Sequence, residues 1–328
     1  MHLNHFNDLD SAHGKLSFLL GRRFYDEQHP LCYTEYDENL NCFTRTTRIN
    51  LRPPFDNLHF LGSCNGVLCF LAYLDICSMQ PAYICNFITR EYTILPKYEG
   101  YGFLNGFGYI PSTNEYKIVR ICKDEGDPNY GIVQVYTLGS VIVCRNGKKM
   151  DYDDLMSFDQ PGEFANGAIH WVNYKETIVA FDLIDEDFRQ LPSPPCNMQL
   201  FVMLHVVSGF LCACYRHSEG SDIWVLKKNE SNHDVIWSKE FSNINGKPII
   251  FTNTGGLLCF VYRDRKVYLY ASKASSSKIL VNEEQNFEIG VPHKNTLVSL
   301  KALGETDTKL MDTAEIESYS EETENNDH

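Results

Sequence analysis

The stretch 62-GSCNGVLCF-70 decides the fold, because its turn and strand recur three more times along the chain. In every copy a small or polar residue precedes a glycine, and an apolar strand follows. Asn-Gly and related pairs supply the positive φ that a tight turn between antiparallel strands requires. The copies, which align Gly66, Gly167, Gly209 and Gly256, are 65-NGVLCF-70, 166-NGAIHW-171, 208-SGFLCA-213 and 255-GGLLCF-260.

Further hairpins lie between these copies. Segment 84-ICNFITREYTILP-96 aligns with 180-AFDLIDEDFRQLP-192, and each contains an apolar strand, a polar turn, an aromatic residue and Leu-Pro. Segment 107-FGYIPSTNEYKIVRI-121 places Pro-Ser-Thr-Asn between two strands, and 131-GIVQVYTLG-139 alternates apolar residues as a strand does. Helical periodicity is nearly absent, so the sequence predicts an all-β protein.

The spacing of the glycines predicts how the strands assemble. Successive distances from Gly66 through Gly108, Gly167 and Gly209 to Gly256 are 42, 59, 42 and 47 residues. A period in the forties with four short strands per unit is typical of β-propeller blades. We therefore predict a kelch-like propeller of about six four-stranded blades, with packed antiparallel sheets as the alternative. The blades are expected to begin near residues 15, 61, 106, 163, 206 and 253.

Closure of the ring needs a strand from one end of the chain to pair with the other end. We expect 296-TLVSLK-301 to provide it, by pairing near 16-LSFLL-20 or 42-CFTRTTRINL-51. The glycine-rich segment 102-GFLNGFG-108 lacks a following helix and a Lys-Ser or Lys-Thr pair, so it is interpreted as a turn and not as a phosphate-binding loop.

The net charge of −14 is unevenly distributed. Residues 303–328 contain nine acidic residues and one lysine, so they carry −8 and residues 1–302 carry −6. Such an acidic segment is expected to be disordered. The predicted organisation is a linker over residues 1–14, the propeller over 15–302 and an acidic tail over 303–328. The body has no cluster of Lys and Arg, so nucleic acid and membranes are not expected partners.

Twelve cysteines are scattered through the chain without the regular framework of a small secreted domain. The first residues, MHLNHFNDLDSAHGK, have no apolar signal-peptide core. A reducing compartment, the cytoplasm or the nucleus, is therefore expected. No apolar run approaches the roughly 18 residues of a membrane helix, so a soluble protein is expected.

Cys64 lies at the centre of Gly-Ser-Cys-Asn-Gly, a spacing similar to the strained elbow that carries a hydrolase nucleophile. The matching positions of the other copies are Ala165, Val207 and Thr254, and a strand rather than a helix follows Gly66. What recurs is the turn, not the thiol. Cys64 is therefore interpreted as a turn residue, no catalytic residue is assigned, and a cysteine hydrolase is the least favoured function.

No metal or cofactor is expected. Cys69, His170, Cys212 and Cys259 share one repeat position, but the channel of six blades is too wide for such ligands to meet at one ion. They are interpreted as core residues. Two acidic groups are interpreted as solvated turns: Asp151, Asp153 and Asp154, and Asp185, Glu186 and Asp187.

Two loops, 97-KYEGYGFLN-105 and 145-RNGKKMDYDDLMSFDQPG-162, are longer or more aromatic than a hairpin needs. Propellers bind partners through loops on one face. The alternative is that these side chains pack under their own loops. The predicted partner-binding residues are Tyr98, Tyr101, Phe103, Tyr152, Met156 and Phe158.

In combination these segments resemble the F-box-associated domain of plant F-box proteins, including the S-locus type. The similarity extends over roughly residues 15–301, in the order expected for the family. The matching segments are 62-GSCNGVLC-69, 86-NFITREYTILP-96, 106-GFGYIPSTNEYKIVRI-121, 133-VQVYTLGS-140, 166-NGAIHW-171, 180-AFDLIDEDFRQLP-192, 222-DIWVL-226 and 296-TLVSL-300. One departure is Asn86-Phe87, where the family usually has Asn-Pro.

The resemblance implies a propeller-like fold and a role as the substrate-recognition half of a ubiquitin-ligase adaptor. In that family an N-terminal F-box docks the Skp adaptor and cullin. The opening MHLNHF resembles the residues just after an F-box, so residues 1–14 are expected to be the remnant of that junction, without the F-box. The expected partner is a protein substrate, with Skp and cullin only if an upstream F-box exists. A stand-alone protein- or glycan-binding propeller is the alternative.

Overall fold

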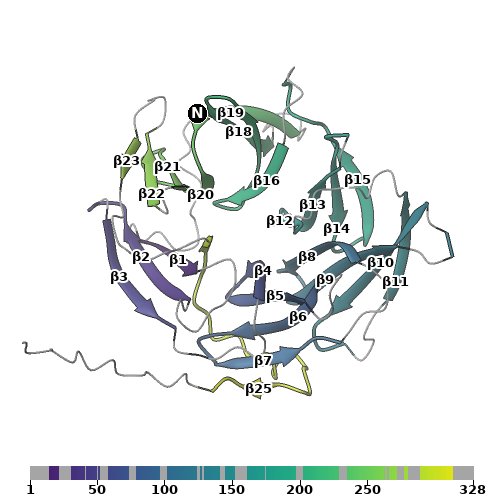
Figure 1. Cartoon of the computed structure of the whole chain (residues 1–328). Coiled ribbons are helices and arrows are strands. Elements are labelled where there is room, and N and C mark those ends of the chain that lie inside the picture. Colours follow the sequence, from purple (N-terminus) through teal and green to yellow (C-terminus); the bar gives the residue numbers. More distant parts are fainter. Residues whose placement is uncertain are drawn as a thin grey trace, which may run out of the picture.

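The computed structural model describes residues 15–21, 31–40, 42–49, 51, 58–73, 79–96, 102–123, 126–127, 129–140, 145–151, 161–173, 175–196, 202–228, 235–261, 263, 266–271, 277–279 and 289–312. These residues form strands, turns and extended segments, with no helix among them. Six antiparallel sheets surround a common centre as a six-bladed β-propeller (Figure 1). The predicted all-β class and propeller architecture are confirmed.

The first three blades contain the N-terminal half of the chain. Blade 1 consists of β24 (Ile289–Pro292), β1 (Lys15–Gly21), β2 (Cys32–Asp37) and β3 (Cys42–Arg48). Blade 2 consists of β4 (Leu58–Cys64), β5 (Val67–Tyr73), β6 (Met79–Asn86) and β7 (Glu91–Ile94), extended by β25 (Lys309–Leu310). Blade 3 consists of β8 (Gly102–Ile110), β9 (Glu115–Lys123), β10 (Tyr130–Thr137) and β11 (Arg145–Asp151).

The other three blades follow in chain order. Blade 4 consists of β12 (Glu163–Ala165), β13 (Ala168–Val172), β14 (Ile178–Asp182) and β15 (Asp187–Leu191). Blade 5 consists of β16 (Val202–Val207), β17 (Phe210–His217), β18 (Gly220–Lys228) and β19 (Val235–Ile244). Blade 6 consists of β20 (Lys247–Phe251), β21 (Leu257–Val261), β22 (Lys266–Tyr270) and β23 (Ser277–Ile279). The blades begin up to six residues before the predicted starts, because the repeated glycine follows the first strand.

The repeated turn joins the two innermost strands of blades 2, 4 and 5. Both turn residues have positive φ at Asn65–Gly66 (44° and 79°), Asn166–Gly167 (51° and 78°) and Ser208–Gly209 (51° and 79°). This is the type I′ geometry that suits the twist of a hairpin. Blade 6 differs, because Gly255 has φ 81° and Gly256 is not among the positive-φ residues. The predicted positive φ is therefore wrong for Gly256, although this glycine, like the other three, directly precedes the second strand of its blade.

Segment 102–108 is not the predicted turn but the first part of β8. Its glycines are needed for space, since a Cβ on Gly106 would lie 2.5 Å from Ile169 Cγ2 of blade 4. A Cβ on Gly108 would lie 2.5 Å from Leu183 Cδ1. Innermost strands of neighbouring blades approach each other closely, and glycine in a strand often marks such an approach. In blade 3 the turn after the first strand is Pro-Ser-Thr-Asn at 111–114, as predicted.

The ring is closed by β24, not by the predicted segment 296–301. β24 pairs antiparallel with β1, with Phe18 opposite Pro292 and Gly21 opposite Ile289. Segment 296–301 forms no strand, because side chains of blade 2 bind its backbone groups. Asn86 Nδ2 donates to the carbonyl oxygens of Thr296 and Val298, at 3.0 and 2.8 Å.

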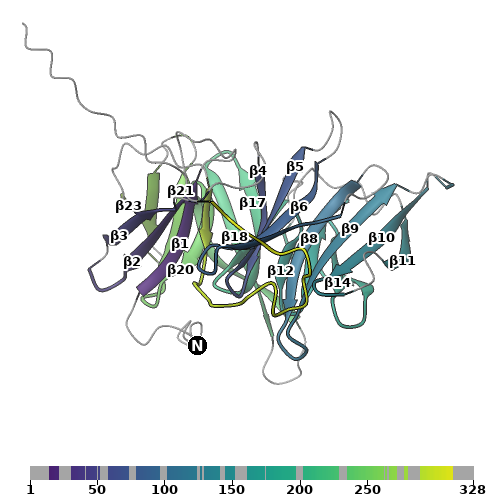
Figure 2. The ribbon, with the colours of Figure 1, turned by 90° about the horizontal axis from the view of Figure 1, so that it is seen from below.

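The ordered chain continues past the predicted boundary at residue 302. Residues 293–312, which we call the strap, run from the centre of the ring outward over blade 2 to β25, in yellow in Figures 1 and 2. Glu305 and Met311 are buried there, and Leu310 pairs with Glu91. The prediction of a disordered tail is therefore wrong for residues 303–312, since buried contacts offset the ordering entropy of this part. Residues 1–14 and 313–328 lie outside the described residues.

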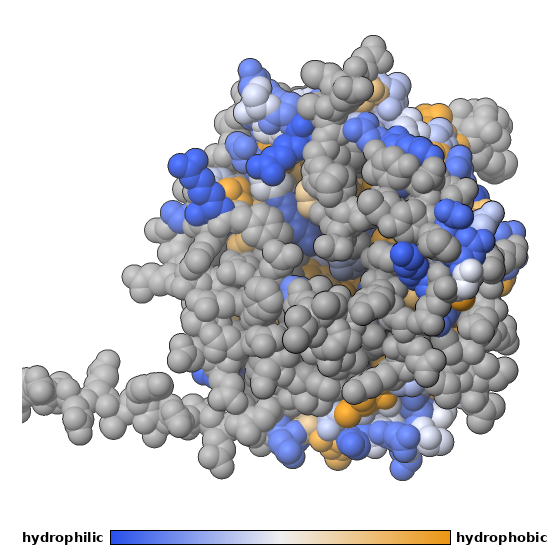
Figure 3. All heavy atoms as spheres, turned by 45° about the vertical axis from the view of Figure 1, so that its right-hand side comes forward, coloured by the Kyte–Doolittle hydropathy of each residue, from blue (hydrophilic) through white to orange (hydrophobic). Residues whose placement is uncertain are grey.

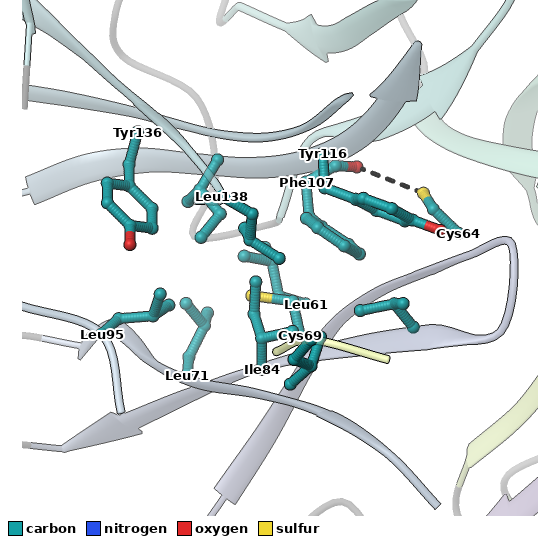
Figure 4. Close-up of a cluster of buried hydrophobic side chains, with 13 residues drawn as sticks. Leu61, Cys64, Cys69, Leu71, Ile84, Leu95, Phe107, Tyr116, Tyr136 and Leu138 are labelled. Carbon is teal, nitrogen blue, oxygen red and sulfur yellow. Dashed lines mark hydrogen bonds between the residues drawn. The ribbon is translucent and has the colours of Figure 1, made fainter. Parts of the chain in front are cut away.

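Hydrophobic side chains fill the spaces between neighbouring blades. One cluster joins blades 2 and 3, with Leu61, Cys69 and Ile84 facing Phe107 and Tyr116 (Figure 4). Five further clusters lie among the other described strands. Within the described part of the chain, no helix is long and apolar enough to span a membrane.

We predict that Gly106→Ala destabilises the propeller by about 1–3 kcal/mol, because the new methyl group overlaps Ile169. The loss should shrink in an Ile169→Ala background, which removes the overlapping atoms. Urea unfolding of the four variants of this cycle measures the coupling. Gly167→Ala is the control: it meets no atom within 4 Å, so only its backbone strain contributes. Equal losses from Gly106→Ala in both backgrounds would contradict the steric explanation.

Candidate functional site

The two faces of the propeller carry different connections. Because successive strands are antiparallel, the turns β4–β5 and β6–β7 lie at the same end of blade 2, and equivalent turns of the other blades share that face. We call it the turn face. The connections from the outermost strand of one blade to the innermost strand of the next, such as β7–β8 and β11–β12, lie on the opposite face. We call that the linker face.

The two predicted recognition loops contain the β7–β8 and β11–β12 connections, so the topology brings both to the linker face. Phe103 lies in β8, the innermost strand of blade 3. The other five predicted partner-binding residues lie outside the described residues: Tyr98, Tyr101, Tyr152, Met156 and Phe158. Their role in binding therefore stays a prediction.

Cys64 is a core residue and not an exposed nucleophile. It is the last residue of β4 and is 6% exposed. Its Sγ donates to the carbonyl oxygen of Phe107 across the interface of blades 2 and 3, at 3.8 Å (Figure 4). Burial raises the pKa of the thiol, so the reactive thiolate is disfavoured.

The repeat position shared by Cys69, His170, Cys212 and Cys259 is buried in all four blades. Burial raises the pKa of each of the three thiols. Among the described residues, no group of three or more His, Cys, Asp or Glu side chains is placed to hold a metal ion. The interpretation of this position as core packing is confirmed.

The innermost strands of blades 4 and 5 are joined by a polar contact that sequence reasoning missed. Glu163 begins β12, and its Oε1 lies 3.6 Å from Nδ1 of His205 on β16. His205 is buried, and desolvation lowers its pKa despite the nearby carboxylate. Both residues stand three positions before the repeated turn, at Asn166 and Ser208, and this shared offset is the signal that could have paired them.

Two further histidines are held neutral in the interior. His170 Nδ1 donates to the carbonyl oxygen of Glu163, 3.2 Å away, and His293 Nδ1 lies 3.1 Å from Ser63 Oγ. Burial lowers the pKa of both imidazoles to about 4. A histidine with so low a pKa is a weak general base near neutral pH, so the Ser63–His293 contact serves to join blades 1 and 2.

The acidic turn after β14 is only partly solvated. Asp185 and Asp187 are exposed, as predicted. Glu186 instead accepts a hydrogen bond from the buried Lys117 Nζ of blade 3 at 2.8 Å, and the same Nζ donates to the carbonyl oxygen of Leu183. This turn therefore anchors blade 4 to blade 3, and the prediction is wrong for Glu186. Asp151 lies in β11, whereas Asp153 and Asp154 lie outside the described residues.

On the side of the molecule seen in Figure 3, the coloured residues are mostly hydrophilic, and the hydrophobic ones form small separate areas. Three exposed aliphatic residues lie in turns of the turn face: Leu40 in the β2–β3 turn, Ile88 in the β6–β7 turn and Ile184 in the β14–β15 turn.

Comparison with known proteins identifies relatives of the whole propeller. The family model of the F-box associated beta propeller domain matches residues 24–284. The F-box protein At3g07870 of Arabidopsis thaliana is 30% identical over 236 residues, covering 60% of this chain and 54% of that protein. The F-box/kelch-repeat protein At3g23880 of Arabidopsis thaliana is 24% identical over 203 residues, covering 57% and 53%. The chain thus spans about half the length of the curated relatives it matches.

Among solved structures, TolB from Acinetobacter baumannii is similar with a TM-score of 0.49 and 12% sequence identity. The similarity covers 85% of this chain and 66% of that one.

We predict that Cys64 reacts with a soluble maleimide only after the protein unfolds, because its thiol is buried and its pKa is raised. Cys42 and Cys196 are partly exposed and serve as controls that react in the native state. Peptide mass spectrometry before and after urea addition measures the modification. Modification of native Cys64 at the rate of Cys42 would overturn its assignment to the core.

We also predict that the free energy of unfolding falls as the pH is lowered from about 6.5 to about 4. His170 and His293 have folded pKa values of about 4, below the value of about 6.5 in an unfolded chain, so acid favours the unfolded state. Their stabilisation is complete above pH 6.5 and is lost as the pH falls.

Each histidine should contribute a slope of up to about 1.4 kcal/mol per pH unit in this window. Urea unfolding at several pH values, compared between the wild type and His170→Gln, measures that contribution. Identical pH profiles for the two proteins would exclude His170 as a source of the acid sensitivity.

Proposed function

Because this chain belongs to the F-box associated β-propeller family, we propose that it is a substrate-recognition module of the F-box type. It binds a protein and presents that protein to a Skp/cullin/F-box ubiquitin ligase. The observation that carries this proposal is the family match over residues 24–284, which includes strands β2 to β23. The named relatives are F-box proteins, and the chain spans about half of their length.

The proposed role is binding without catalysis. The buried thiols of Cys64, Cys69, Cys212 and Cys259 support it, because their raised pKa values disfavour nucleophilic attack. Association with the Skp adaptor and cullin belongs to the proposal only for a chain that carries an F-box. The scattered, reduced cysteines support a site of action in the cytoplasm or nucleus.

We place substrate recognition on the linker face. The β7–β8 and β11–β12 connections both reach that face, and their sequences contain aromatic residues beyond those that the strands need. Loops held by a rigid scaffold are the usual location of binding residues. The turn face of blades 2 and 3 is covered by the strap, which supports the same assignment.

We predict that alanine substitution of Tyr98, Tyr101 and Tyr152 in the full chain lowers recovery of its specific protein partner by at least about tenfold. Aromatic side chains at the centre of an interface commonly contribute more than 1 kcal/mol each. Quantitative affinity capture with crosslinking from plant extract measures recovery, and the partner is then confirmed by binding with purified protein.

Leu40→Ala with Ile184→Ala is the matched control, since both residues are exposed on the turn face. This control should recover the partner as the wild type does. Loss of the partner in the control, with full recovery by the triple variant, would place recognition on the opposite face and contradict the proposal.

A further inference from the structure

The strap, residues 293–312, contacts the turn face of blades 2 and 3 as a bound peptide would. It contributes only the two-residue strand β25 to a sheet, and β24 has already closed the ring at Pro292. Within the strap, a turn forms between Ser299 and Glu305, where the N–H of Leu303 donates to the carbonyl oxygen of Ser299, and a second turn follows, where Thr308 Oγ1 donates to the carbonyl oxygen of Glu305. The other contacts come from side chains and turns of the two blades.

The first part of the strap is recognised through its backbone. The carboxamide of the fully buried Asn86 donates to the carbonyl oxygens of Thr296 and Val298, and its Oδ1 accepts the N–H of Ile88 at 2.9 Å. Thr296 Oγ1 donates to the carbonyl oxygen of Asn65 at 3.0 Å. A Cβ on Gly66 would overlap the Thr296 side chain, so this glycine provides space as well as its turn conformation.

The centre of the strap is recognised by one carboxylate and one apolar pocket. Glu91 Oε1 accepts from Ser299 Oγ at 2.9 Å, and its Oε2 accepts from the N–H of Leu300 at 2.6 Å. The Leu300 side chain is fully buried in the cluster between blades 2 and 3. At Ser299-Leu300 the blades therefore bind both the backbone and the side chains of the strap.

In the last part of the strap, one acidic side chain and one apolar side chain are bound by the blades. Glu305 Oε1 accepts from Tyr136 Oη at 2.9 Å and from the N–H of Gly139 at 2.7 Å, both on blade 3. Met311 is buried, its carbonyl oxygen accepts from Arg90 Nη2, and its N–H donates to the carbonyl oxygen of Arg90, both at 2.8 Å. Two neighbouring blades thus supply hydrogen-bonding and apolar contacts along the whole strap.

From these contacts we propose that the turn face of blades 2 and 3 is a peptide-recognition groove, which the strap occupies as an intramolecular ligand. The groove fits a segment of a partner protein that has Ser-Leu, then a turn, and Glu five residues after the Leu. This inference deepens the proposed function, because it gives the protein-binding module a second, conditionally open surface. The groove residues from Asn65 to Gly139 lie within the family match, and the strap follows its last matched residue, 284.

The strap also sets the selectivity of the groove. A tethered ligand acts at an effective concentration on the order of millimolar, so only a partner segment that reproduces most of its contacts displaces it. Carbonyl recognition by Asn86 is independent of sequence, whereas Glu91, the Leu300 pocket and the Glu305 site select side chains. Segments lacking the Ser-Leu and Glu positions are excluded.

The test uses the full chain with Leu300→Asp and Glu305→Ala, which weaken the strap without changing the groove. The probe is a fluorescent synthetic peptide of residues 293–312, and the control peptide has alanine at positions 299, 300 and 305. We expect the first peptide to bind the variant at least about 100-fold more tightly than the control peptide does, and to bind the wild type at least about tenfold more weakly than the variant. A folded variant that binds both peptides equally would overturn the proposal.

Circular dichroism establishes whether the variant is folded. If the variant is not folded, hydrogen exchange of the wild type tests whether the strap is released from the groove. The amides of Leu300, Leu303, Glu305 and Met311 are hydrogen-bonded in the strap. If the strap is a releasable ligand, they exchange at least about 100-fold faster than the slowest amides of β5 and β9. Exchange at the rate of those core strands would overturn the proposal, and it would leave the linker-face result unaffected.

Discussion

The pairing of β24 with β1 is the contact on which the rest of this propeller depends. It joins strands from near the two ends of the described chain in one sheet, with Leu19 opposite Val291 and Leu20 opposite Gly290. Closing so long a loop costs entropy, although the cost grows only slowly with loop length. Closure also makes blade 1 four-stranded, and it places Pro292 at the centre of the ring. The hydrogen bond from the N–H of His293 to the carbonyl oxygen of Ser17 then directs the chain out over blade 2.

Packing between blades buries most of the cysteine thiols among the described residues. The inner strands approach so closely that Gly106, Gly108 and Gly162 are needed between blades 3 and 4. Cysteine fills similar small spaces at Cys69, Cys212 and Cys259, where it behaves as a small apolar residue with a raised pKa. Buried polar groups such as Lys117 and His205 connect one blade to the next. We therefore propose that recognition takes place on the two faces.

The two faces have different physical roles. On the turn face, short hairpins present backbone groups and a few polar side chains in fixed positions, and the strap satisfies those of blades 2 and 3. The connections between blades start and end on the linker face, and we propose recognition there because the sequences of two of them contain aromatic residues beyond those that the strands need. The family to which the chain belongs, its buried thiols and this division support a module that binds proteins. A strap that rests on one face while partners dock on the other would let two surfaces act independently.

Hairpins, the blade count and the burial of the repeated cysteines followed from the sequence alone. Each depends on residues that are close in the chain. Asn65–Gly66 has positive φ because of its own residue types, and the spacing of the repeated glycines corresponds to the length of a single blade. Only the tertiary structure decided which segment closes the ring, why Gly106 and Gly108 lie in a strand, and that Glu163 meets His205. It alone placed 303–312 against blades 2 and 3, where Glu305 and Met311 find their partners. These contacts join residues far apart in the sequence, and the geometry of the closed ring sets their register, which local patterns do not encode.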